Sequence, residues 1–197
     1  MHGAGANGSA PIRVTAGFTG TLGTQVSGLV GTTPEADSVE TGPFDPPNPS
    51  PATDRREVVV PAGTKLVRFD VDGAAGDDLD LYVYQVVGGE ETLVDLSADG
   101  DADEMVSLRN PDAGTYVAYV NGFATPAGGD YDWSQWVVRP TDAGNLTVTP
   151  ASVPVTVGQT VTLTAAWSGL DTTKRWLGFV GLTNGGTEVG GTVVSVN

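Results

Sequence analysis

Residues 77–84 read Asp77-Asp78-Leu79-Asp80-Leu81-Tyr82-Val83-Tyr84, and this alternation of apolar and polar residues predicts a β-strand. Side chains alternate along a strand, so the two leucines and Val83 share one side, while Asp78, Asp80 and the tyrosines share the other. Asp78 and Asp80 therefore lie about 7 Å apart on one face. The apolar side predicts a core contact, and the acidic side requires an explanation of its own.

The preceding segment repeats this pattern. In residues 66–72, Val67, Phe69 and Val71 alternate with polar residues, and five aspartates fall between positions 70 and 80. Carboxylates held this close repel one another, so the fold must expose them to water, protonate some of them or place a cation among them. Calcium, which takes six to eight oxygen ligands, is the natural cation. A solvated acidic loop is the alternative.

The composition excludes several classes of function. With 24 acidic and nine basic residues the net charge is −15, which argues against binding to nucleic acid or to an anionic membrane surface. No apolar run approaches the roughly 20 residues needed to cross a bilayer. The absence of cysteine removes disulfides, zinc–thiolate sites and thiol catalysis.

The rest of the chain predicts an all-β protein. No segment shows helical periodicity, and short apolar segments separated by Gly, Asn, Pro and Asp indicate antiparallel sandwiches. Residues 54–140 predict a jelly-roll sandwich of seven strands. Residues 143–197 supply only five strands, whereas an immunoglobulin-like or Fn3-like sandwich needs about seven. We therefore expect the N-terminal strands of residues 11–40 to pack with residues 143–197.

Two segments predict no regular structure. Residues 1–10 are small and glycine-rich, and we expect a flexible leader. Residues 41–53 contain five prolines, which deny hydrogen bonds to a ladder, and we expect an extended linker or a strap across a surface.

Catalytic motifs are not found. A Ser-His-Asp triad needs a base beside the serine, and the only histidine is His2, within the predicted leader. The run from Asp99 to Glu104 begins like an EF-hand loop but has Glu104 where glycine is required and Asn110 where glutamate is required. We expect it to be an acidic hairpin turn.

Three motifs, in this order along the chain, carry a family resemblance: residues 58–64 (Val-Val-Val-Pro-Ala-Gly-Thr), residues 77–84 and residues 111–122 (Pro-Asp-Ala-Gly-Thr-Tyr-Val-Ala-Tyr-Val-Asn-Gly). Together they resemble the pre-peptidase C-terminal (PPC-like) domain of secreted bacterial peptidases. The flanking segments 11–20, 144–148 and 166–170 resemble the C-terminal region of actinobacterial subtilisin-like serine peptidases.

The resemblance implies a secreted, non-catalytic accessory module behind an upstream peptidase catalytic domain in the parent chain, with protein or polysaccharide substrate as a further partner. Related collagenase sandwiches bind calcium through acidic residues, which implies Asp77, Asp78 and Asp80 as ligands. Asp72, on the neighbouring strand, completes the predicted Ca²⁺ set. The alternative function is a free-standing cell-surface adhesin or a carbohydrate- or collagen-binding module.

Overall fold

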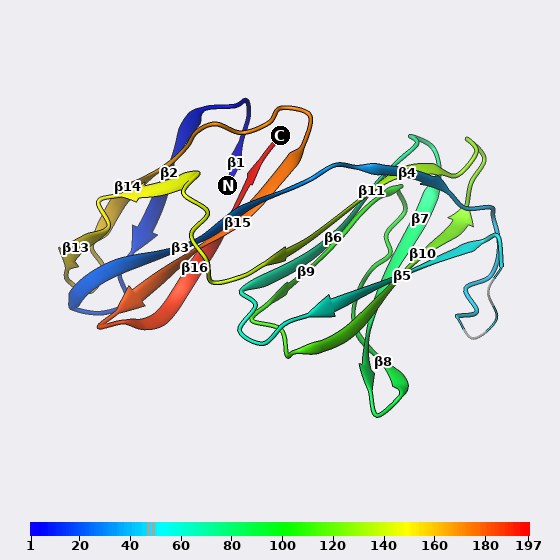
Figure 1. Cartoon of the computed structure of the whole chain (residues 1–197), viewed down its shortest axis with the longest axis horizontal. Coiled ribbons are helices and arrows are strands. Elements are labelled where there is room, and N and C mark those ends of the chain that lie inside the picture. The colour runs from blue at the N-terminus through cyan, green and yellow to red at the C-terminus, as the bar shows by residue number, and fades with distance from the viewer. Residues whose placement is uncertain (47, 49) are drawn as a thin grey trace. The chain divides into compact units, whose positions relative to one another are not determined.

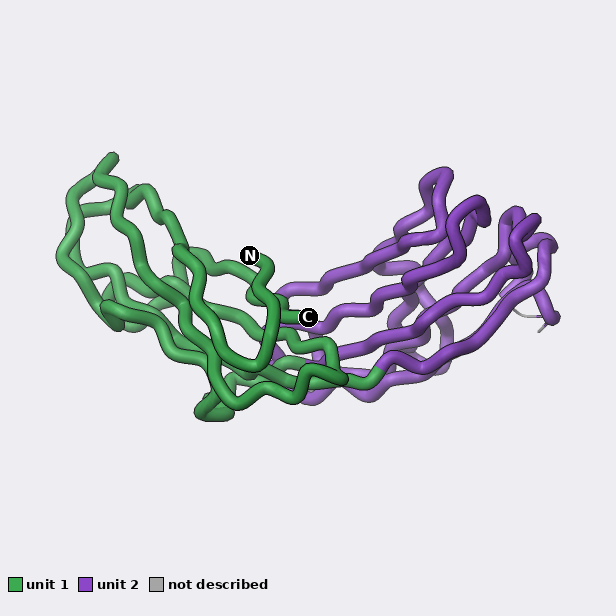
Figure 2. Tube along the Cα trace, turned by 90° about the horizontal axis from the view of Figure 1, so that it is seen from above, with its two compact units in different colours: residues 1–33, 138–197 green, residues 34–137 purple. Residues whose placement is uncertain are grey.

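The computed structural model describes residues 1–46, 48 and 50–197, and its regular elements are all β-strands. The predictions of an all-β protein and of antiparallel sheets are confirmed. Strands gather into two compact units, coloured separately in Figure 2: unit 1 is Met1–Thr33 with Val138–Asn197, and unit 2 is Pro34–Val137. The described chain contains no helix long and apolar enough to span a bilayer.

Unit 2 consists of two four-stranded antiparallel sheets, whose strands are labelled in Figure 1. The first sheet has the order β5-β10-β7-β8, with the bounds β5 (Thr53–Val60), β10 (Gly114–Ala124), β7 (Asp78–Val87) and β8 (Glu90–Ser97). The second has the order β4-β11-β6-β9, with the bounds β4 (Glu35–Ser38), β11 (Asp130–Val138), β6 (Leu66–Gly73) and β9 (Asp103–Arg109).

The alternation of side chains along the strands builds the core of unit 2. Leu79, Leu81 and Val83 are all fully buried on the inner side of β7. From the opposing sheet come Phe69 and Trp133, whose ring centroids lie 5.9 Å apart. Each large apolar side chain buried in this way stabilises the fold by about 1.5–3 kcal/mol. The inner face predicted from the period-two pattern is therefore confirmed.

Unit 1 also contains two sheets that share one apolar core. The larger has the order β1-β16-β15-β3-β13, with the bounds β1 (His2–Gly3), β16 (Thr187–Val196), β15 (Arg175–Asn184), β3 (Gly20–Thr32) and β13 (Ser152–Val155). The smaller has the order β12-β14-β2, with the bounds β12 (Leu146–Thr149), β14 (Thr160–Trp167) and β2 (Gly8–Thr15). Strand β1 runs parallel to β16, and the other ladders of unit 1 are antiparallel.

The N-terminal residues differ from the predicted flexible leader. Residues 1–10 include β1 and the beginning of β2, and the indole of Trp167 donates a hydrogen bond to the carbonyl of Gly5 at 3.2 Å. A Cβ added to Gly3 or Gly8 would lie within 2.5 Å of the Trp167 ring. Glycine at these two positions allows the main chain to lie against the indole, so the glycine content reflects close packing.

The segment between β3 and β5 also differs from the prediction. Strand β4 lies within residues 11–40, which we expected to pack with residues 143–197, yet it pairs with β11 in unit 2. Within the predicted linker, Gly42 donates a hydrogen bond to the carbonyl of Gly122 at 2.9 Å. We call residues 41–44 the strap, because they lie along β10. Pro47 and Pro49 of the predicted linker lie outside the described residues.

Candidate functional site

The carboxylate of Asp77 contacts the loop between β10 and β11 in unit 2. Its side chain is buried, and its two carboxylate oxygens accept hydrogen bonds from the N–H groups of Ala127 at 2.6 Å and Gly129 at 2.8 Å. Gly129 has φ +75°, and a Cβ there would lie 1.8 Å from the carbonyl oxygen of Val39. The backbone geometry thus requires glycine, and Asp77 satisfies the two loop amides that point at it.

The other predicted calcium ligands are not gathered around Asp77. Asp80 is buried and accepts a hydrogen bond from the Tyr82 hydroxyl at 2.9 Å, while burial raises the pKa of its carboxyl against the effect of that bond. Asp78 has a buried Oδ1 with no hydrogen-bond partner, and Asp72 is exposed on β6. Within the described residues, these four carboxylates do not form a group of three with oxygens at ligand distance from one another. A calcium site at Asp72, Asp77, Asp78 and Asp80 stays a prediction.

A different acidic cluster is present at the predicted hairpin turn. Asp99, Asp101 and Glu104 each place a carboxylate oxygen within 4.8 Å of the others. The predicted acidic hairpin turn is wrong, because β8 and β9 belong to different sheets. Glu104 lies on β9 and is only 1 % exposed.

The outer face of the sheet β5-β10-β7-β8 carries a cluster of aromatic rings. Tyr82 lies opposite Tyr119 in the ladder between β7 and β10. Phe44, from the strap, stacks on Tyr82 with ring centroids 4.0 Å apart and an interplanar angle of 9°. Tyr119 receives two edge contacts, from Phe44 at 5.8 Å and from Tyr84 at 5.6 Å. We call these four residues the aromatic cluster.

Charged groups fix the centre of the aromatic cluster. The hydroxyl of Tyr119 donates to Glu91 at 2.8 Å and accepts a hydrogen bond from Arg55 at 3.2 Å. Arg55 also forms an ion pair with Glu91 at 3.1 Å. Burial raises the pKa of the Tyr119 phenol and its hydrogen bond to Glu91 adds to this, while Arg55 opposes the shift. These bonds and the ring contacts hold Tyr119 in one orientation.

A pocket of about 410 Å³ opens beside the cluster, between the strap and the sheet. Its lining includes Phe44 and Tyr82, the buried polar residues Asp80 and Asn121, and Phe123, which is 63 % exposed. An apolar wall with a few polar groups is typical of ligand pockets.

Exposed leucines extend this surface along the edge strand β8. Leu96 lies opposite Tyr82 in the ladder, and Leu93 lies opposite Tyr84, so both leucines share the face of the aromatic cluster. They are 46 % and 45 % exposed. An exposed apolar patch rimmed by polar residues marks an interaction site. We call the aromatic cluster with Leu93 and Leu96 the binding face.

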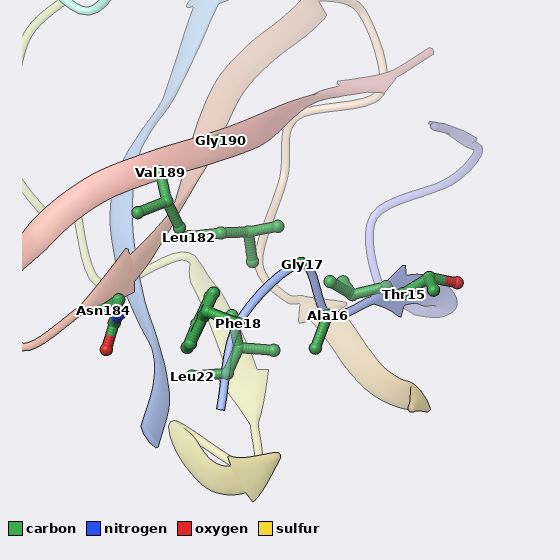
Figure 3. A pocket seen from close by; sticks show the side chains of 10 residues that line it. Thr15, Ala16, Gly17, Phe18, Leu22, Leu182, Asn184, Val189 and Gly190 are labelled. Carbon is green, nitrogen blue, oxygen red and sulfur yellow. The ribbon is translucent and has the colours of Figure 1, made fainter. Parts of the chain in front are cut away.

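Unit 1 contains a separate pocket of about 430 Å³ (Figure 3). Phe18, Leu22, Leu182 and Val189 supply apolar walls, and Asn184 contributes one amide. None of the described lining residues is titratable, so this pocket offers apolar contact without acid–base chemistry.

His2, the only histidine in the sequence, contacts Ser195 in unit 1. Nδ1 of His2 lies 2.6 Å from Oγ of Ser195, and the same Oγ lies 3.4 Å from the carbonyl oxygen of Met1. A catalytic triad also needs a carboxylate that orients the imidazole and donors for an oxyanion. The described contacts give His2 no carboxylate partner. We interpret this pair as a contact that holds β1 on β16.

One segment of the chain matches a known protein family. The profile of the bacterial pre-peptidase C-terminal domain family matches residues 52–122, which include strands β5 to β9 and most of β10. Domains of this family are non-catalytic and follow the catalytic domains of secreted bacterial peptidases. A search of curated proteins finds no match to the chain. Tyr82, Tyr84 and Tyr119 lie within the matched segment.

Proposed function

We propose that this chain is the non-catalytic accessory region of a secreted subtilisin-like serine peptidase and that it binds protein substrate through the binding face. The match of residues 52–122 supports an accessory role beside an upstream peptidase domain. The subtilisin-like parent, and a contribution to stability or maturation, rest on the resemblance of the flanking segments.

The observation that carries the proposal is the aromatic cluster on the outer sheet face, in which Tyr119 is buried and the other three rings are half-buried beside the exposed Leu93 and Leu96. Aromatic side chains bury 150–250 Å² each and dominate the energetics of interfaces. The ring contacts and the bonds from Tyr119 to Glu91 and Arg55 order these side chains in advance, which lowers the entropic cost of binding. Acidic residues beside the rings favour polypeptides that carry both apolar and basic side chains.

Binding is tested with the whole chain on immobilised gelatin, casein and insoluble cell-wall polysaccharide. We expect the chain to bind a protein probe and expect Tyr84→Ala and Leu96→Ala each to weaken that binding by about tenfold, because both remove apolar contact area from the binding face. Met105→Ala is the matched control, since Met105 is 49 % exposed on β9 of the other sheet. Surface plasmon resonance gives the dissociation constants.

Other outcomes contradict the proposal in distinguishable ways. Binding to polysaccharide alone would favour the adhesin or carbohydrate-binding alternative. Equal losses in Met105→Ala and Tyr84→Ala would exclude the binding face as the site. Hydrolysis of casein by the isolated chain would contradict the accessory role itself.

A further inference from the structure

The connection between β8 and β9 brings three carboxylates together at one end of unit 2. Asp99 and Asp101 lie on this connection, and Glu104 is the second residue of β9. One carboxylate oxygen of each lies within 4.8 Å of one oxygen of each of the others. Three negative charges at this spacing repel strongly unless something neutralises them.

Glu104 is the unusual member of the group. It faces inward, in the same alternating row as Val106, and is 1 % exposed. Its Oε1 accepts a hydrogen bond from the N–H of Asp99 at 3.2 Å, whereas its Oε2 is buried and has no hydrogen-bond partner. A buried carboxylate is costly unless it is paired or coordinates a metal. Glu104 is therefore a buried carboxylate with one unpartnered oxygen, in a group that the exposed Asp99 and Asp101 complete.

Burial raises the pKa of the Glu104 carboxyl, while hydrogen bonds from Ser97 and from the main chain of Asp99 oppose the shift. The charges of Asp99 and Asp101 raise that pKa further, in agreement with the short distances between the three carboxyl groups.

The main chain holds the two aspartates in place. Oδ1 of Asp99 accepts the N–H of Asp101 at 3.3 Å, and Oδ1 of Asp101 accepts the N–H of Asp103 at 2.9 Å. The carbonyl of Asp101 accepts the N–H of Leu79 at 3.0 Å, which ties the loop to β7. These bonds use one oxygen of each aspartate, and the second oxygen of each is left to bind a cation.

We propose that Asp99, Asp101 and Glu104 bind one Ca²⁺ ion. Calcium accepts six to eight oxygens in irregular geometry, so three carboxylates, loop carbonyls and water can complete its shell at the exposed side of the loop. The ion gives the buried carboxylate of Glu104 a charged partner and offsets the mutual repulsion of the three carboxylates. Magnesium, which demands near-ideal octahedral geometry and retains its water, fits this loop less well. This site is separate from the predicted set at Asp72, Asp77, Asp78 and Asp80.

The test uses the whole chain, stripped with EDTA and dialysed. We expect isothermal titration with CaCl₂ to give one ion per chain, and a hundredfold excess over Kd to raise the unfolding midpoint of unit 2 by about 5 °C or more. MgCl₂ at the same concentration is expected to give a smaller shift. Glu104→Gln and Asp101→Asn should weaken calcium binding at least tenfold, while Asp80→Asn and the exposed control Asp95→Asn should retain it.

The calcium-free midpoints give a second readout. Glu104→Gln removes a buried charge from the cluster without changing its shape, so its calcium-free midpoint should lie above that of the wild type while its calcium response is lost. An unchanged midpoint of the wild type at millimolar CaCl₂ would overturn the proposal. Loss of the calcium response in Asp80→Asn, with the response retained in Glu104→Gln, would overturn the proposal in favour of the site predicted at Asp72, Asp77, Asp78 and Asp80.

Discussion

Replacing Asp77 with alanine is expected to destabilise unit 2 by about 4 kcal/mol, because it leaves two N–H groups without acceptors, each at a cost of about 1–3 kcal/mol, and removes a charge-assisted pair of bonds. The two groups belong to Ala127 and Gly129, and the side chain that they contact is 3 % exposed. The loss follows from the hydrogen bonds alone, because Asp77 makes no apolar contribution to the core.

Two measurements separate this effect from a general loss of charge. Urea unfolding gives the free-energy change, and hydrogen exchange at the amides of residues 127 and 129 reports the local loss of protection. Asp77→Asn keeps one acceptor oxygen, so it should cost about half as much. Asp112→Ala, an exposed aspartate before β10, is the control and should stay within about 0.5 kcal/mol of the wild type. Wild-type stability in Asp77→Ala would show that the loop is held by other contacts.

Replacing Arg56 with alanine is expected to destabilise unit 2 by about 2 kcal/mol, because it breaks an ion-pair network whose centre, Arg56 with Asp54, is mostly buried. Arg56 donates from Nε to Asp54 at 2.6 Å, pairs with Glu35 and Asp37 of β4, and lies 5.2 Å from the ring centroid of Trp133. Burial alone would lower the pKa of Arg56, but its hydrogen bond and attraction to Asp54 raise it on balance. The network joins β5 of one sheet to β4 of the other.

Arg55 provides the matched control, because it is the neighbouring residue on the same strand and faces the other side of the sheet. Its ion pairs with Glu57 and Glu91 join side chains that are 28–53 % exposed. Surface pairs of this kind contribute about 0–1 kcal/mol, so Arg55→Ala should cost about 1 kcal/mol or less, with its hydrogen bond to Tyr119 included. Equal losses in the two variants, measured by urea unfolding, would contradict the central role that we assign to Arg56.

The period-two pattern was sufficient to predict the strands and their inner faces. Leu79, Leu81 and Val83 are buried as the alternation required. The aromatic cluster could not be predicted in the same way, although Tyr82 and Tyr84 were assigned to the outer face. Their contacts depend on β10 pairing with β7 and on a strap that brings in Phe44, and one sequence does not reveal strand order.

The burial of Glu104 could have been predicted from the sequence. In β9, Glu104 lies on the same side as Val106 and Leu108, and that apolar side faces the core. Alternation alone therefore indicated a buried glutamate, yet we interpreted the run from Asp99 to Glu104 as an acidic hairpin turn. Asp77 is different, because its partners lie about 50 residues away in a loop whose position depends on the whole sandwich.

Because unit 2 is inserted between β3 and β12, the strands of unit 1 are synthesised in two groups, one before unit 2 and one after it. Thr15 pairs with Thr160 and Thr32 pairs with Arg175, so β2 and β3 leave the ribosome long before their partner strands exist. Unit 2 is complete before those partners emerge, and its sheets pair strands from within residues 34–138. Domains of a nascent chain generally fold as units during synthesis, so unit 2 can fold while β2 and β3 still lack their partner strands.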